Sequence, residues 1–146
     1  MNMNDIKPEQ SFFDRQMGFA VLRVMVGINM LTRSIVRIPE LQDFVNGMVS
    51  NFSDTFLPDP FVMVFGYTVV LVETITGILL ILGWKTRWAL AAVGVLLCCL
   101  AFGMILQQNF GTAANIMIYG IAVSLLLFHT KYDGFGIDRG IPKSGN

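Results

Sequence analysis

The stretch from Leu71 to Arg87, LVETITGILLILGWKTR, decides the fold that we expect, because it joins a long apolar helix, one acid and a sharp turn. Glu73 is the only formal charge between Phe61 and Gly83. A carboxylate at the centre of a membrane helix costs roughly 2.5–3.5 kcal/mol on insertion scales unless a partner or a proton offsets it. The identity of the group that faces Glu73 is therefore the main question that the sequence raises.

The composition of the whole chain indicates an integral membrane protein. Its 146 residues are 54% hydrophobic and only 14% charged, whereas soluble domains carry about 25% charged residues. No Lys, Arg, Asp or Glu occurs between Trp88 and Thr130, and about 20 apolar residues suffice for one spanning helix. The formal net charge is zero and there is no basic block, so the expected partner is the lipid bilayer and not a nucleic acid.

The hydrophobic pattern predicts an all-α fold, an integral membrane four-helix bundle in a single membrane domain that covers residues 1–146. The spans are expected at about 17–38, 61–82, 88–106 and 113–129. Between the first two spans, apolar residues recur at helical spacing over about residues 40–56, and this segment is too short and too polar to span. We expect an amphipathic helix at the membrane interface, which serves either as a lid over the mouth of the bundle or only as a plug. A polar head, residues 1–16, precedes the first span.

Arg23 is the predicted partner of Glu73. Arg23 lies six residues from the inner end of the first span and Glu73 nine residues from the inner end of the second, which places them at depths of about 9 and 13 Å. A long arginine side chain can close such a gap and can bind a carboxylate through two hydrogen bonds. The sequence thus predicts a buried Arg23–Glu73 ion pair. If these two side chains do not meet, Glu73 needs Arg33, a proton or a ligand instead.

Other polar residues of the outer half of the bundle predict a pocket between the first and second spans. The candidate pocket residues are Asn29, Arg33, Arg37, Tyr67, Asn115 and Tyr119. Two arginines that face polar groups suit an anionic or carbonyl-bearing molecule. Three interpretations stay open. The charges are a clamp that fixes helix register, with arginines that reach toward the interface; or they line a ligand or quinone pocket; or they line a path for protons or a solute.

The sequence contains no motif for a metal, a cofactor or a nucleophile. His129 is the only histidine, so ligation of haem by two histidines is excluded, and no cluster has metal-ligand spacing. Ser34 and Ser124 have no neighbouring histidine with which to form a hydrolytic pair. No cofactor is evident, and quinone is the one that the pocket leaves open. The sequence therefore favours a chain that is not an enzyme by itself, without deciding the matter.

The residues at 73–77, ETITG, and those at 82–87, LGWKTR, with an apolar run between them, resemble a motif of the DoxX family of small four-helix bacterial membrane proteins. That family has E-x-x-x-G, an apolar run and L-G-x-x-T-R. The resemblance covers about Leu22 to Asp138, and Arg23 matches an early arginine of the family. Arg33 and Ser34 stand where the family often has His-Gly, so no role of a titrating imidazole carries over. The resemblance implies a four-helix bundle in the bacterial inner membrane. Because one member type is a subunit of thiosulfate:quinone oxidoreductase, it also implies a link to redox or thiol systems.

The function expected from the sequence is that of a membrane subunit or anchor of a quinone- or thiol-linked redox system. Its partners would be redox proteins or a second copy of the chain. The alternatives are a quinone-using oxidoreductase in its own right and a small-solute carrier. A co-purified partner favours the first, quinone turnover by the purified chain favours the second, and flux into liposomes favours the third.

The positive charges predict that both termini lie in the cytoplasm. The head, the turn between the second and third spans and the tail carry Lys7, Arg15, Lys85, Arg87, Lys131, Arg139 and Lys143. The other side carries only Arg33 and Arg37, and loops rich in Lys and Arg stay in the cytoplasm. A reporter that is active only in the periplasm, fused after Asn146, is expected to be silent. Strong activity of that fusion would invert the proposed topology.

Overall fold

The computed structural model describes residues 8–137, which form five α-helices and one short 3-10 helix. They are α1 (Pro8–Arg37), α2 (Leu41–Phe52), α3 (Asp59–Leu82), α4 (Thr86–Leu106), α5 (Phe110–Phe128) and η2 (Thr130–Tyr132). Within these residues α1, α3, α4 and α5 are long and apolar enough to cross a membrane. The predicted all-α fold, its four spans and the short helix between the first two are confirmed. Four residues used in the sequence argument, Lys7, Asp138, Arg139 and Lys143, lie outside the described part of the chain.

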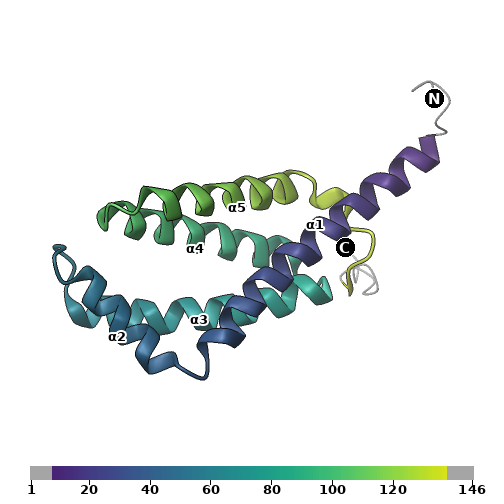
Figure 1. Ribbon diagram of the computed structural model, residues 1–146. Coiled ribbons are helices and arrows are strands. Elements are labelled where there is room, and N and C mark those ends of the chain that lie inside the picture. The colour runs from purple at the N-terminus through teal and green to yellow at the C-terminus, as the bar shows by residue number, and fades with distance from the viewer. Residues whose placement is uncertain (1–7, 138–146) are drawn as a thin grey trace, which may run out of the picture.

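Helix α1 begins earlier than the sequence suggested. Residues 8–16 had been assigned to a polar head, but the helix already starts at Pro8 and continues without a break to Arg37. Proline is well tolerated in the first turn of a helix, and no glycine or further proline occurs before Gly18. The first turns of α1 therefore extend beyond the other helices at one end of the bundle (Figure 1).

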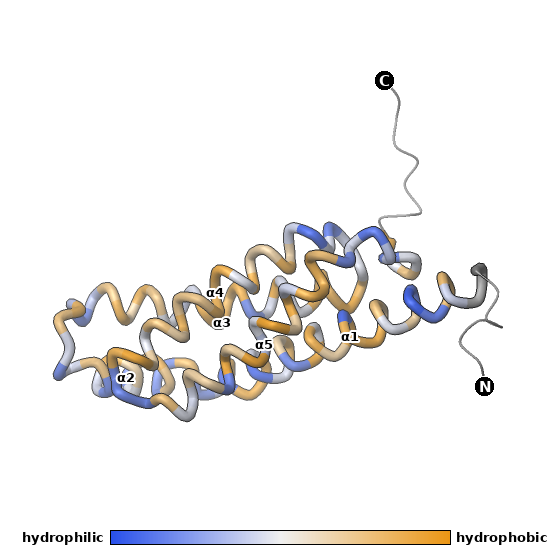
Figure 2. Tube along the Cα trace, turned by 90° about the horizontal axis from the view of Figure 1, so that it is seen from above, coloured by the Kyte–Doolittle hydropathy of each residue, from blue (hydrophilic) through white to orange (hydrophobic). Residues whose placement is uncertain are grey.

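The helices are arranged as two antiparallel pairs, α1 with α3 and α4 with α5, and α3 also packs against α4 (Figure 1). The buried core between them is apolar and includes Met30, Leu80, Leu90 and Val93. Figure 2 shows that hydrophilic residues gather mainly toward the two ends of the bundle, while the lengths of the helices are largely hydrophobic. Many large apolar side chains are exposed along all four long helices, which is the surface that a lipid bilayer covers.

Helix α1 turns a stripe that contains its buried polar residues into the bundle. Arg23, Gly27, Met30 and Ser34 are buried, and Met25 on the opposite face is exposed. An inward polar face and an outward apolar face are what a spanning helix in a bundle requires.

Helix α2 packs along α3. Val45 contacts α3 at Gly66, and Phe52 reaches α4 at Gly103. Both side chains are buried, while Phe56, beyond the end of the helix, is exposed. The amphipathic pattern was thus interpreted correctly, and the helix covers the first half of α3.

The closest approach between α1 and α3 occurs at Gly27 and Gly77. A Cβ atom added to Gly77 would lie 2.8 Å from the backbone nitrogen of Leu31 and 3.1 Å from the carbonyl oxygen of Gly27. Real Cβ atoms are almost never that close to backbone atoms, so a side chain at position 77 would push the two helices apart. Small residues at such a crossing allow the backbones of membrane helices to touch.

Gly77→Ala is expected to destabilise the bundle by about 1–3 kcal/mol, because overpacking forces backbone shifts. Thermal unfolding in detergent measures this loss. Gly120→Ala is the matched control, since a Cβ at that position in α5 meets nothing within 4 Å. Equal stability of the two variants would show that α1 and α3 do not cross at these glycines.

Candidate functional site

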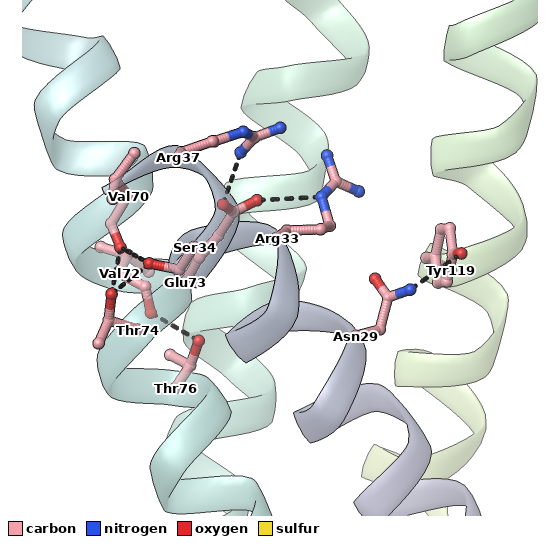
Figure 3. Close-up of polar contacts among 10 residues, drawn as sticks. All are labelled: Asn29, Arg33, Ser34, Arg37, Val70, Val72, Glu73, Thr74, Thr76 and Tyr119. Carbon is pink, nitrogen blue, oxygen red and sulfur yellow. Dashed lines mark hydrogen bonds and ion pairs between the residues drawn. The ribbon is translucent and has the colours of Figure 1, made fainter. Parts of the chain in front are cut away.

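Glu73 is buried in the α1–α3 interface and is held by two arginines in the last turns of α1. Arg37 donates a hydrogen bond of 2.6 Å from Nη1 to Oε2 of Glu73. The Nε of Arg33 lies 3.4 Å from Oε1, an ion pair without a hydrogen bond. Arg37 also stacks over the ring of Phe44 at 4.6 Å, which connects α2 to the cluster. Figure 3 shows the Glu73 carboxylate between the two guanidinium groups. We call Glu73, Arg33 and Arg37 the charge triad.

Hydroxyl groups fill the interface beside the charge triad. Ser34 is fully buried and donates a hydrogen bond of 3.1 Å to the carbonyl oxygen of Val70. Its hydroxyl also contacts that of Thr74, which in turn donates to Val70. Pairing of polar groups between helices is what permits them inside a membrane. These contacts fix Glu73 opposite the last turns of α1 (Figure 3).

The predicted Arg23–Glu73 ion pair is wrong. Arg23 is buried and pairs with Asp133, with Nη1 2.7 Å from Oδ1. The antiparallel register explains the difference, because Ser34 lies against Val70 and Arg23 lies against Gly83. Gly83 follows Glu73 by ten residues, a distance of about 15 Å along a helix. The expected depths were counted from helix ends, and α1 begins earlier than those ends assumed.

Residues 130–137, which we call the C-terminal strap, fold back across the end of the bundle that holds Arg23. The guanidinium of Arg23 lies between Gly83 and Gly136, with Nη2 3.5 Å from the carbonyl oxygen of Phe135. Gly83 has a φ of 67° and ends α3, a conformation that glycine adopts at little cost. Asp133 was not among the predicted site residues, although its place in the sequence just beyond the last span makes it a candidate partner for a buried arginine.

Arg15 and Tyr132 join α1 to the C-terminal strap at the surface. Arg15 donates a hydrogen bond of 3.0 Å to the Tyr132 hydroxyl. This bond favours the phenolate and lowers the pKa of Tyr132 below its ordinary value. Arg15 and Arg23 therefore both tie the strap to α1, and of these two contacts only that of Arg23 is buried. The rings of Phe12 and Phe13 also contact those of Tyr132 and Phe135.

The polar pocket lies between α1 and α5, and not between the first and second spans as predicted. It has a volume of about 480 Å³ and is lined by Arg33, Thr112, Asn115, Ile116, Ile118 and Tyr119. Asn29 stands beside it and donates a hydrogen bond of 3.2 Å to the Tyr119 hydroxyl. The register of α1 explains the position of the pocket. Arg37 binds Glu73 on the α3 side of α1, whereas Arg33 lies between α3 and α5 (Figure 3).

Two predicted pocket residues lie elsewhere. Arg37 belongs to the α3 side of the charge triad, and Tyr67 is exposed on α3 and does not line the pocket. Thr112, in the first turn of α5, was not predicted to line it. The structure thus brings together Asn29, Arg33, Asn115 and Tyr119 out of the predicted set.

A second pocket, between α2, α3 and α4, is almost entirely apolar. It has a volume of about 370 Å³ and is lined by Phe52, Leu57, Phe61, Val62, Phe65, Cys98, Cys99, Phe102 and Gly103. Both cysteines are free thiols. Within residues 8–137 no group of three or more His, Cys, Asp or Glu side chains could hold a metal ion. The aromatic lining suits a flat ring or a hydrocarbon chain.

Glu73→Gln is expected to destabilise the protein by about 3–5 kcal/mol, because it leaves two arginines without their carboxylate. Arg37→Gln should couple to it, so that the double variant loses about 0.5–3 kcal/mol less than the sum of the single losses. Unfolding in detergent measures these values. Arg23→Gln with Glu73→Gln is the control, since the two residues share no partner, and their losses should add. Strong coupling between Arg23 and Glu73 would contradict the register.

Comparison with known proteins identifies the family. The family model described as methylamine utilisation protein MauE matches residues 15–115, which is most of the chain and includes Arg23, the charge triad and Asn115. No curated protein and no solved structure matches the chain. The expected resemblance is confirmed in part: MauE is related to the DoxX-like small four-helix membrane proteins, and DoxX itself is not the family that matches. The chain belongs to the MauE family of membrane proteins.

Proposed function

We propose that this protein is a membrane subunit or anchor of a redox system for methylamine utilisation. The family match over residues 15–115 carries this proposal. Use of methylamine requires oxidation of its C–N bond, so electrons must pass to an acceptor. A multi-pass protein of the inner membrane, with both termini in the cytoplasm, is suited to anchor or assemble such a system. Its partners would be redox proteins or a second copy of the chain.

The arrangement of charges supports a role beyond simple anchoring. A single apolar helix is enough to hold a partner at the membrane, whereas this bundle keeps three charged side chains together at the α1–α3 interface. Ionisable groups within spans are costly and are commonly functional. The polar pocket beside the charge triad, lined by Arg33 and Asn115, is the part of the molecule that we assign to this function.

The tagged protein, purified from native membranes in mild detergent, is expected to bring redox proteins with it. Mass spectrometry of the eluate measures the enrichment against an unrelated tagged four-span protein. Enrichment of an amine-oxidising enzyme or of its electron acceptors supports the proposal. An eluate that contains no redox protein above the control would contradict it.

A quinone-using oxidoreductase is the second candidate, and the apolar pocket favours it. The ring of a quinone fits among Phe61, Phe65 and Phe102, and its isoprenoid tail would extend into the lipid. Reduction of a short-chain quinone by the purified chain, with a dithiol as electron donor, tests this function. The control is the same mixture without protein, and a rate equal to that control removes the candidate. Flux of a solute into liposomes would favour a carrier instead.

A further inference from the structure

The charge triad carries one positive charge in excess, and this charge is on Arg33. Arg37 donates a hydrogen bond to Glu73 and stacks on Phe44. Arg33 approaches Glu73 only at 3.4 Å through Nε, and within residues 8–137 it makes no hydrogen bond. Its side chain is 31% exposed. The terminal amino groups of Arg33 point away from Glu73, into the space in front of α5 (Figure 3).

Unpartnered polar groups surround the same space. Asn115 lines the pocket opposite Arg33 and makes no hydrogen bond in the part of the chain that the structure describes. The side-chain oxygen of Asn29, beside the pocket, is buried and has no partner among the described residues, but it is an acceptor, which pairs with a donor such as water and not with an anion. Thr112, in the first turn of α5, also lines the pocket, and its backbone N–H already donates to the side-chain oxygen of Asn109. Polar groups at membrane depth are costly to leave unpaired.

We propose that the pocket between α1 and α5 binds an oxyanion, either the phosphodiester of a lipid headgroup or a free phosphate or carboxylate, through the guanidinium of Arg33. Asn115 donates a second hydrogen bond from its side-chain amide. This inference rests on the pocket named in the proposed function and specifies the class of its ligand, but it requires no redox partner.

Charge favours an oxyanion over other ligands. A cation would add to the excess positive charge of the charge triad, and a neutral carbonyl would leave that charge uncompensated. A carboxylate or phosphate neutralises it and accepts two parallel hydrogen bonds from one guanidinium. Arg33 can turn toward such a ligand without loss of the hydrogen bond that holds Glu73, because Arg37 makes that bond. The ligand can therefore exchange while the α1–α3 interface stays intact.

The test measures the thermal unfolding of delipidated protein in neutral detergent while a probe is added. The probes are dihexanoyl phosphatidylglycerol, its zwitterionic phosphatidylcholine counterpart, inorganic phosphate and acetate. A ligand that binds only the folded protein raises the unfolding midpoint in a saturable manner. We expect the rise in the unfolding midpoint to saturate with phosphatidylglycerol or with the free anions. Arg33→Gln should weaken the affinity at least about tenfold, the loss typical of one charged hydrogen bond.

Two further variants separate binding from folding. Arg87→Gln removes an exposed arginine at the other end of the bundle and should bind as the unchanged protein does. Asn115→Leu removes a side chain that is exposed and makes no hydrogen bond in the described structure. This variant should fold normally and should bind the anionic probe more weakly than the unchanged protein does.

The probes also identify the source of the oxyanion. A response to phosphatidylglycerol alone assigns a lipid headgroup, and a response to phosphate or acetate assigns a free anion. Either one supports the proposal if Arg33→Gln weakens it. No saturable response to any probe, or a response that Arg33→Gln leaves unchanged, would overturn it. Neither result bears on whether redox proteins co-purify, so the two proposals fail separately.

Discussion

A carboxylate inside a membrane bundle must be neutralised, and the position of Glu73 sets the register between α1 and α3. Glu73 meets Arg33 and Arg37 near one end of α1, while Arg23 lies against Gly83 and pairs with Asp133 near the other. Buried ion pairs contribute little net stability once desolvation is counted, but a pair that loses one partner is strongly unfavourable. A slip of α1 along α3 would separate Glu73 from Arg33 and Arg37 and would move Arg23 away from its place beside Gly83. The charged contacts therefore specify the alignment, and the apolar core and the close crossing at Gly77 supply the packing.

The two charged clusters differ in what holds them. At the α2 end, the charge triad is formed by two neighbouring helices, and Phe44 of α2 covers Arg37. At the opposite end, Arg23 takes its acid from the C-terminal strap, 110 residues away in the sequence. The glycines at 83 and 136 leave room for the guanidinium between α3 and the strap. The strap follows the fourth span in the sequence and supplies the carboxylate that pairs with Arg23, which has no other among the described residues.

The sequence predicted the helices well and the contacts between charges poorly, for physical reasons. Runs of about 20 apolar residues and the 3.6-residue period of α1 identify spans and an inward face directly. Pairing between Arg23 and Glu73 was inferred from depths counted from helix ends, and the end of α1 at Pro8 lay outside the apolar pattern. The inner ends of the two predicted spans are not level, because Arg23, six residues into the first span, lies beside Gly83 at the end of α3. Glu73 lies ten residues before Gly83, at the level of Arg33. The contact with Asp133 depends on how a glycine-rich segment folds back, which periodicity does not encode.

The position of the pocket follows from the uneven packing of the four spans. Helix α5 is the least buried of the four spans, and α3 is the most buried. Glu73 draws α1 toward α3, so the contact between α1 and α5 is left to a few groups such as Asn29 and Tyr119. Glu73 neutralises only one of the two arginines, and the other, Arg33, faces the loosely packed side of α1 next to α5. Two arginines of α1 face one glutamate of α3. This arrangement explains both the tight pairing on the α3 side of α1 and the open polar pocket on the α5 side.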